Sequence, residues 1–138
     1  MKLSKKDAKL FLEIFKFYPF VKIAATVDIP SEISELLNSE LQRCEGELDI
    51  FENDNFRPKR GVYDYVVICD TLDENILQTA KNSLKAVAEL VVLLDKNRFG
   101  LYEAVDKISE ADFAAANDID LFDEYHLITA KRLLMYGV

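Results

Sequence analysis

Two short apolar runs lie near the middle of the chain, and each is followed by an acidic residue. The first spans residues 66–69 and precedes Asp70, and the second spans residues 90–94 and precedes Asp95. Such runs are typical of strands buried on both faces of a sheet. Between them, residues 75–87 have helical spacing, with one apolar stripe of Ile76, Leu77, Ala80, Leu84 and Val87. The pattern predicts a βαβ unit of two parallel strands with a right-handed, helical crossover.

The N-terminal pattern predicts an amphipathic helix over residues 4–17, with Ser4 at the N-cap position. This helix leads into a group of aromatic residues around a proline: Phe17, Tyr18 and Phe20. We interpret the helix as packed on the sheet. The alternative is contact with a protein partner, or with a second copy in a homodimer, because a small chain has little core in which to bury so many aromatic side chains.

The next elements are predicted from alternating patterns and capping signals. Residues 21–27 predict a first strand, and Ser31 fits the N-cap of a helix that Gly46 ends. Residues 47–51 alternate charged and apolar side chains, which predicts a second strand more exposed on one face. Residues 52–62 are first acidic and then basic and predict a loop. Its basic part enters the next strand from the amino end, away from the carboxyl edge where ligands of open α/β sheets bind.

The C-terminal third is predicted to contain short elements. A loop over residues 95–100 precedes a short helix over residues 101–108, and Ser109 fits the N-cap of an Ala-rich helix that ends at Ala116. Residues 119–122 and 125–133 then predict an antiparallel hairpin, although residues 127–135 also fit a helix. No internal repeat and no linker divides the sequence, so we expect residues 1–138 to form a single domain.

Composition and charge exclude several classes of function. Half of the residues are hydrophobic and 30% are charged, as in ordinary globular proteins. The formal net charge of −8 argues against nucleic-acid binding, which needs basic surface. We expect no membrane span, because no apolar stretch approaches the ~20 residues that a span needs, and no secretory signal, because Asp7 and Lys9 interrupt the stretch after the N-terminal lysines. The two cysteines have no metal-binding spacing, so we expect no metal site and a reducing, cytoplasmic setting.

The charge is unevenly distributed along the chain. Residues 103–124 hold Lys107 as their only basic residue against eight acids: Glu103, Asp106, Glu110, Asp112, Asp118, Asp120, Asp123 and Glu124. We interpret the segment as a solvated acidic face, and the alternative is a docking surface for a basic partner.

The order of elements resembles that of class I S-adenosylmethionine-dependent methyltransferases. Residues 63–68, Tyr-Asp-Tyr-Val-Val-Ile, are similar to a strand of that family with an aromatic residue, Asp and an apolar run. Residues 84–93 are similar to the stretch that leads into the family's next strand, and residues 21–23 lie where its first strand begins. The resemblance implies a reduced, three-layer Rossmann-like α/β fold: a mostly parallel sheet, helices on both faces and a C-terminal antiparallel hairpin.

The sequence departs from the family at the turn after its first strand. The family has a Gly-rich turn there, which lets the backbone approach the cofactor, whereas residues 24–30 of this chain contain no glycine. We expect Cβ atoms and Pro30 to crowd the cofactor's space. The acid that would bind the ribose is Glu52 or Asp54, and one strand–helix unit is missing between residues 51 and 63.

These observations favour a non-catalytic methyltransferase-like module that binds no cofactor and acts through protein–protein interaction. The alternative is a small methyltransferase with a divergent cofactor turn. The resemblance then implies that the residues bordering S-adenosylmethionine are Thr26, Asp28, Glu52, Asp54, Asp70, Thr71 and Leu72. The sequence assigns no catalytic residue.

Two other interpretations of the acids stay open. Phosphoacceptor receiver domains also have a Tyr-Asp strand ending in Asp, which would make Asp70 the acceptor, but the acid pair that should follow the first strand is incomplete. The acids after the strands could also gather at one edge and recruit a cation. Against that, Asp side chains commonly cap the following helix or turn, and we favour capping.

Overall fold

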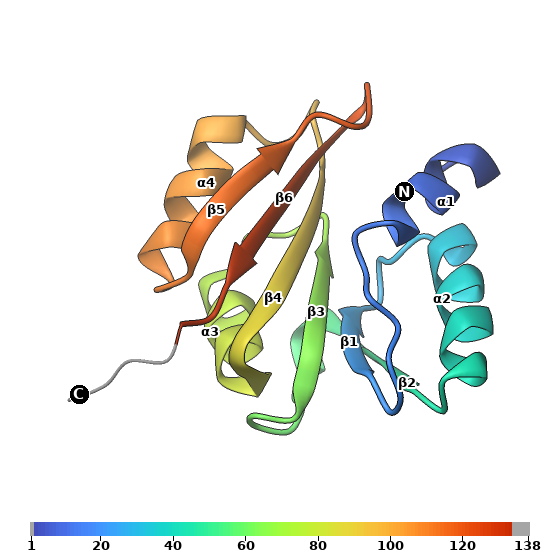
Figure 1. Cartoon of the computed structure of the whole chain (residues 1–138). Helices are drawn as coiled ribbons and strands as arrows, with labels where there is room; N and C mark the ends of the chain where they lie inside the picture. Colours follow the sequence, from blue (N-terminus) through green and yellow to red (C-terminus); the bar gives the residue numbers. More distant parts are fainter. Residues whose placement is uncertain (1, 134–138) are drawn as a thin grey trace.

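The structure, a computed structural model, describes residues 2–133. These residues form one sheet and four α-helices (Figure 1). The strands are β1 (Lys22–Thr26), β2 (Glu47–Phe51), β3 (Tyr63–Cys69), β4 (Leu84–Asp95), β5 (Ala114–Ile119) and β6 (Tyr125–Lys131). The helices are α1 (Lys5–Leu12), α2 (Ser31–Arg43), α3 (Glu74–Ser83), α4 (Leu101–Glu110) and a 3₁₀ turn, η1 (Asn53–Asn55).

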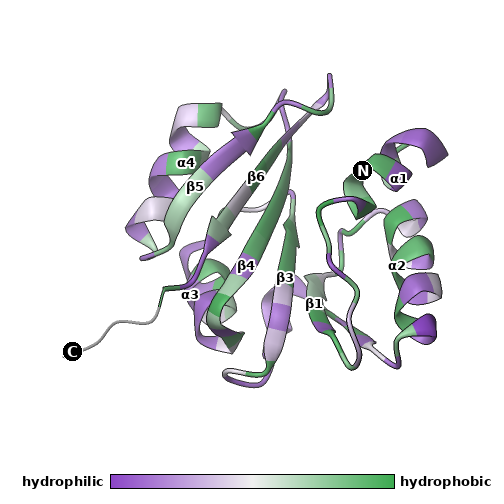
Figure 2. Cartoon of the chain, viewed as in Figure 1, coloured by the Kyte–Doolittle hydropathy of each residue, from purple (hydrophilic) through white to green (hydrophobic). Residues whose placement is uncertain are grey.

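The core consists of two layers of side chains, one on each face of the sheet. Every residue of β3 is buried, as are residues 90–94 of β4, so both central strands are covered on both faces, as predicted. Helices α1 and α2 pack on one face and α3 and α4 on the other (Figure 1). Figure 2 shows the apolar residues along β4 and polar residues on the outer turns of the helices. The expected three-layer α/β fold is confirmed.

The strand order is β2-β1-β3-β4-β6-β5. Strands β1 to β4 are parallel, whereas β6 runs antiparallel to β4 and β5 antiparallel to β6, which confirms the C-terminal hairpin. Because the chain proceeds outward from β1 to β2 and then returns to the other side of β1, the order reverses between β1 and β3. Ligands of open α/β sheets bind at such a reversal, outside the carboxyl ends of the strands. As predicted, residues 52–62, which link β2 to β3 along the chain, form no strand, and within residues 2–133 β2 lies at an edge of the sheet.

Several predictions for the second half of the chain are wrong. Helix α3 ends at Ser83, and Leu84 and Val87 belong to β4 although they extend the helical stripe. The Arg132 guanidinium donates to the carbonyl oxygens of Lys81, Asn82 and Leu84, which satisfies the end of the helix. The Ala-rich residues after Ser109 form no helix: α4 continues to Glu110, and β5 begins at Ala114. The predicted strand over residues 119–122 therefore begins five residues too late. The alternative of a helix over residues 127–135 is wrong for residues 127–131, which lie in β6, and residues 134–135 lie outside the described part.

The N-terminal helices differ from the predictions mainly at their ends. Helix α1 ends at Leu12, before the predicted residue 17, and Ser4 caps it by accepting from the Asp7 amide at 3.1 Å. Ser31 is the first residue of α2 rather than its N-cap, which is Pro30. At the other end Glu45, with φ of 58°, takes the left-handed turn, and Gly46 follows it. Among the described residues, no helix is long and apolar enough to cross a membrane.

Candidate functional site

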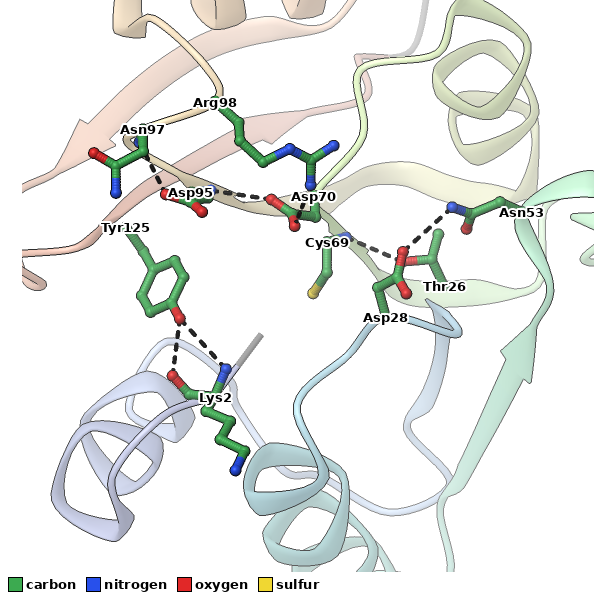
Figure 3. A network of polar contacts seen from close by, with 10 residues as sticks. All are labelled: Lys2, Thr26, Asp28, Asn53, Cys69, Asp70, Asp95, Asn97, Arg98 and Tyr125. Carbon is green, nitrogen blue, oxygen red and sulfur yellow. Dashed lines mark hydrogen bonds and ion pairs between the residues drawn. The ribbon is translucent and has the colours of Figure 1, made fainter.

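At the reversal of strand order, a side chain links the carboxyl ends of β1 and β3 beyond their last backbone pair. The register of the two strands ends at Ala25 opposite Val67. Beyond it, the Thr26 hydroxyl oxygen accepts a hydrogen bond from the Cys69 backbone N–H at 3.0 Å (Figure 3). Thr26 is fully buried. It holds the two strand ends together, which is a structural role that the sequence did not predict.

The turn after β1 presents only two side chains to solvent. The Ile29 N–H donates to the Thr26 carbonyl oxygen at 3.1 Å, so the chain turns tightly without glycine. Ile29 is 7% exposed and belongs to the core beneath α1 and α2, and Pro30 is also buried. Val27 and Asp28 are exposed. The expected crowding by Pro30 is therefore absent, because this part of the turn faces inward.

Asp28 lies beside the residues that follow β2. Its carboxylate accepts a hydrogen bond from the Asn53 side-chain amide, with Oδ2 and Nδ2 3.4 Å apart (Figure 3). The other end of that amide, Asn53 Oδ1, is buried and has no hydrogen-bond partner among the described residues. The two ribose candidates, Glu52 and Asp54, flank Asn53 and are exposed. The structure thus brings Asp28 next to the segment that holds both acids.

A cavity of about 290 Å³ opens beside Asn53, between η1 with its following loop and the start of α3. It combines polar, basic and apolar side chains and is lined by Asn53, Asp54, Asn55, Phe56, Arg57, Asp73, Asn75, Ile76 and Thr79. Phe56 is buried and packs edge-on against Phe51, with ring centroids 5.7 Å apart. This loop therefore takes the place of the missing strand–helix unit and forms one wall of the cavity.

Asp70 lies at the carboxyl end of β3, and both of its carboxylate oxygens have partners. Oδ1 accepts from the Asp95 backbone N–H at 3.2 Å, and Oδ2 is 2.6 Å from Nη1 of Arg98 (Figure 3). Asp70 has a φ of 60°, in the left-handed region. The other two candidates here shape the entry to α3: Thr71 Oγ1 accepts from the Asp73 amide at 3.2 Å, and Leu72 is 4% exposed in the core.

Capping explains two of the acids that follow the strands. Asp95 Oδ1 accepts from the Asn97 amide at 2.8 Å, and Asp73 is the N-cap of α3, accepting from the amides of Asn75 and Ile76. No three His, Cys, Asp or Glu side chains within residues 2–133 are placed to hold a metal ion. Burial raises the pKa of the Cys69 thiol, so this cysteine is a poor nucleophile.

The N-terminal segment closes one side of the same edge of the sheet. The Tyr125 hydroxyl donates to the Lys2 carbonyl oxygen at 2.9 Å, and Leu3 is buried beneath α1 and α2 (Figure 3). A second cavity, of about 360 Å³, lies between residues 2–7 and residues 121–125. Of the aromatic residues after α1, Tyr18 is 44% exposed and Phe20 70% exposed. The protein partner or homodimer contact there stays a prediction.

The sequence matches no protein-family model and no curated protein. Solved structures do share its fold. Phosphoethanolamine N-methyltransferase 2 of Haemonchus contortus, in complex with phosphomonomethylethanolamine and S-adenosylhomocysteine, aligns with a TM-score of 0.70 and 7% identity, over 94% of this chain and 53% of that one. A SAM-dependent methyltransferase from Aquifex aeolicus aligns with a TM-score of 0.66 and 9% identity, over 92% and 90%. Human N-acetylserotonin methyltransferase in complex with SAM aligns with a TM-score of 0.64 and 15% identity, over 93% and 52%.

These comparisons show that the chain has the fold of class I S-adenosylmethionine-dependent methyltransferases, in a reduced form. It spans about half the length of the Haemonchus and human proteins and most of the Aquifex protein. The expectation that the chain works without a cofactor is wrong, because the Haemonchus and human proteins of this fold were solved with S-adenosylhomocysteine and SAM, respectively. Ile29 and Pro30 are buried, so only Val27 and Asp28 of this turn present side chains to solvent. The comparisons favour the methyltransferase hypothesis over the non-catalytic module.

Proposed function

We propose that this chain binds S-adenosylmethionine at the carboxyl edge between β1 and β3 and acts as a small methyltransferase. The observation that carries the proposal is the orphaned acceptor of Asn53, which is buried and has no partner among the described residues. Buried polar atoms are nearly always hydrogen-bonded, so an unpaired acceptor at the ligand-binding edge of this fold indicates a ligand that donates to it.

The orientation of the Asn53 side chain follows from its neighbour. The Asp28 carboxylate only accepts hydrogen bonds, so the Asn53 amide must turn its N–H₂ group toward Asp28. Asn53 Oδ1 is then directed away from Asp28 and can accept a hydrogen bond from a ligand. The 6-amino group of adenine is a donor of matching chemistry. The adjoining cavity of about 290 Å³ offers apolar surface from Phe56 and Ile76 to a flat ring.

The acids around Asn53 suit the sugar of the same ligand. Asp28, Glu52 and Asp54 have exposed side chains, and carboxylates accept hydrogen bonds from ribose hydroxyls. The bound cofactor supplies a methyl group on a positively charged sulfur, ready for transfer to a nucleophile. The residues of this chain hold and orient it, and the cavity of about 360 Å³ beside residues 2–7 leaves room for an acceptor at the same edge.

Isothermal titration calorimetry with S-adenosylmethionine and S-adenosylhomocysteine tests the proposal. We expect micromolar binding to the full chain and a loss of about tenfold for Asn53→Ala, since one buried hydrogen bond contributes roughly 1–1.5 kcal/mol. Asn38→Ala, an exposed asparagine on α2, is the matched control and should bind as the unmodified protein does. No heat of binding at millimolar ligand would overturn the proposal. Equal affinities for Asn53→Ala and the unmodified protein would remove Asn53 from the site.

A further inference from the structure

We infer that the amino edge of the sheet is a dimer interface, at which two copies of this chain pair about a two-fold axis through Val87. The surface consists of Tyr18 and Phe20, which precede β1, and of residues 85–89 in β4. It lies at the amino end of β3, at the bottom of the sheet in Figure 1, and therefore opposite the candidate site. Pairing at this edge does not depend on the proposed function.

Phe20 occupies a turn position that favours glycine. The Val21 N–H donates to the Tyr18 carbonyl oxygen at 3.2 Å, which closes a four-residue turn with Pro19 in its second position. Phe20 is the third residue and has a φ of 65°. A turn with proline second and a positive φ third usually has glycine there, because a side chain is strained in that conformation. The Phe20 side chain is nevertheless 70% exposed, so burial within this chain does not explain it.

Val87 combines strain and exposure in the same way. A register shift near the start of β4 places four residues, 85–88, opposite a single residue of β3, Asp64. Val87 lies in this irregular stretch with a φ of 64°, which is an outlier for a β-branched residue, and its side chain is 57% exposed. Its backbone N–H donates to the Arg132 carbonyl oxygen at 2.6 Å, which holds the conformation in place.

The two strained residues belong to one surface. Among the described residues with a positive φ, Phe20 and Val87 are the two with large apolar side chains. Strained residues concentrate at functional sites, and apolar side chains gathered on a surface mark contacts with other proteins. Tyr18 is 44% exposed and lines, together with residues 85–89, a cavity of about 200 Å³. The surface thus has both projecting apolar side chains and a cavity that can receive such side chains.

The charges on this surface favour a second copy as the occupant. A two-fold interface needs a surface that is complementary to itself. Lys85 and Glu89 carry opposite charges, two residues before and two residues after Val87. When two copies of residues 85–89 run in opposite directions, Lys85 of each copy lies beside Glu89 of the other, and the Val87 side chains meet at the axis. Lys85 also contacts Asp64, but half of its side chain is exposed, so its ammonium group can pair with a second carboxylate.

Sedimentation equilibrium of the full chain measures the pairing. We expect a monomer–dimer equilibrium, with a dissociation constant that rises roughly tenfold or more in Phe20→Gly and in Val87→Gly, as for central interface residues. Glycine takes a positive φ without strain, so both variants keep the backbone and lose only an exposed side chain. Tyr102→Ala removes an aromatic side chain that is 86% exposed on α4. It is the matched control and should dimerise as the unmodified chain does.

Cross-linking locates the axis. Val87→Cys should form a disulfide-linked dimer on mild oxidation, because the axis brings the two thiols together, whereas Tyr102→Cys should not. The unmodified chain controls for Cys44, its half-buried thiol.

Three results would overturn the interface. The first is a chain that sediments as a monomer at every concentration, and the second is a dimer that neither glycine variant weakens. The third is a dimer that Tyr102→Ala weakens as much as Val87→Gly does, because association would then be non-specific. A strictly monomeric chain that binds S-adenosylmethionine would leave the proposed function standing while the interface fails.

Discussion

The ammonium group of Lys85 lies 3.0 Å from the buried carboxylate of Asp64 at the amino end of β3. Asp64 is 7% exposed, and its other oxygen accepts from the Lys22 backbone N–H at 2.8 Å. One carboxylate thus ties together β1, β3 and β4 at the edge opposite the candidate site. Burial by itself would raise the pKa of Asp64, but hydrogen bonds from Tyr18, Lys22 and Lys85 outweigh it, and the pKa lies below its ordinary value.

The lowered pKa predicts how Asp64→Asn changes stability with pH. The substitution should lower the free energy of unfolding by about 2 kcal/mol at pH 7, because an amide cannot accept from all of these donors. A carboxylate with a depressed pKa in the folded state stabilises above its unfolded pKa of about 3.9, and the gain disappears as the pH falls through the folded value. The difference between the two proteins should therefore be constant from pH 5 to 8 and shrink below pH 4.

Urea unfolding followed by far-ultraviolet circular dichroism measures this difference, since the chain has no tryptophan. Asp123→Asn, which changes an exposed acid in the β5–β6 loop, controls for the loss of one negative charge. A difference between Asp64→Asn and the unmodified chain that persists unchanged at pH 3 would contradict the assignment of the effect to the ionised carboxylate.

The Thr26 hydroxyl should be needed for stability at the reversal of the sheet. Thr26→Val keeps the shape of the side chain but leaves the buried Cys69 N–H without an acceptor, which costs about 1–3 kcal/mol. Thr26→Ser keeps the hydroxyl and should cost less, about 1 kcal/mol for the lost methyl group. Hydrogen exchange of the Cys69 amide gives a local readout and should be faster in Thr26→Val alone. Equal protection in all three proteins would show that the contact is dispensable.

Gly46 should resist replacement for a steric reason. A Cβ atom at this position would lie 2.5 Å from the Val21 carbonyl oxygen and 2.7 Å from a methyl group of Leu41. We expect Gly46→Ala to lower the free energy of unfolding by about 1–3 kcal/mol, as overpacked positions do. A Cβ at Gly100 would meet nothing within 4 Å, and this residue is the N-cap of α4, so Gly100→Ser should be neutral or slightly stabilising. Thermal melts of the two variants that coincide would rule out the clash.

Asn53→Leu should separate stability from ligand binding. The substitution removes the buried, unpaired acceptor and puts an apolar side chain of similar size in its place. The ligand-free protein should therefore be as stable as the original or more stable by about 1 kcal/mol, since an unsatisfied buried group costs about that much or more. Its melting temperature should no longer rise when S-adenosylhomocysteine is added. A clear loss of stability without ligand would mean that Asn53 has a structural role instead.

The fold followed from the sequence wherever burial alone decides the structure. Strands β3 and β4 are covered on both faces, so their apolar runs could be recognised. The first three residues of β5, 114–116, were assigned to a helix because the strand lies at an edge, is only partly buried, and begins with an Ala-rich sequence that lacks the apolar alternation of a strand. The end of α3 was misplaced because Leu84 is fully buried in either conformation and only the tertiary contacts of Arg132 fix the boundary.

Only part of the candidate site could be predicted from the sequence. Acids after parallel strands share one edge, so the sequence could place Asp28 and Asp70 at the same edge of the sheet, where Figure 3 shows them. Whether a side chain is orphaned or paired depends on packing between loops, so the unpaired acceptor of Asn53 and the partnership of Asp70 with Arg98 carry no sequence signal. The structural role of Thr26 had one sequence signal, a single hydroxyl at the end of an apolar strand. This is the position at which the backbone pairing of β1 with β3 ends.

The outermost strand β2 has consequences for how the molecule behaves in concentrated solution. Among residues 2–133 no strand lies beyond β2, and Ile50 is 47% exposed, so the outer edge of β2 could pair with a strand of another chain. Antiparallel pairing of two copies about the middle of β2 would set the Asp49 carboxylates against each other and bring Glu47 opposite Phe51. Like-charge repulsion between the Asp49 side chains thus opposes pairing along this edge, and neutralising Asp49 should favour aggregation.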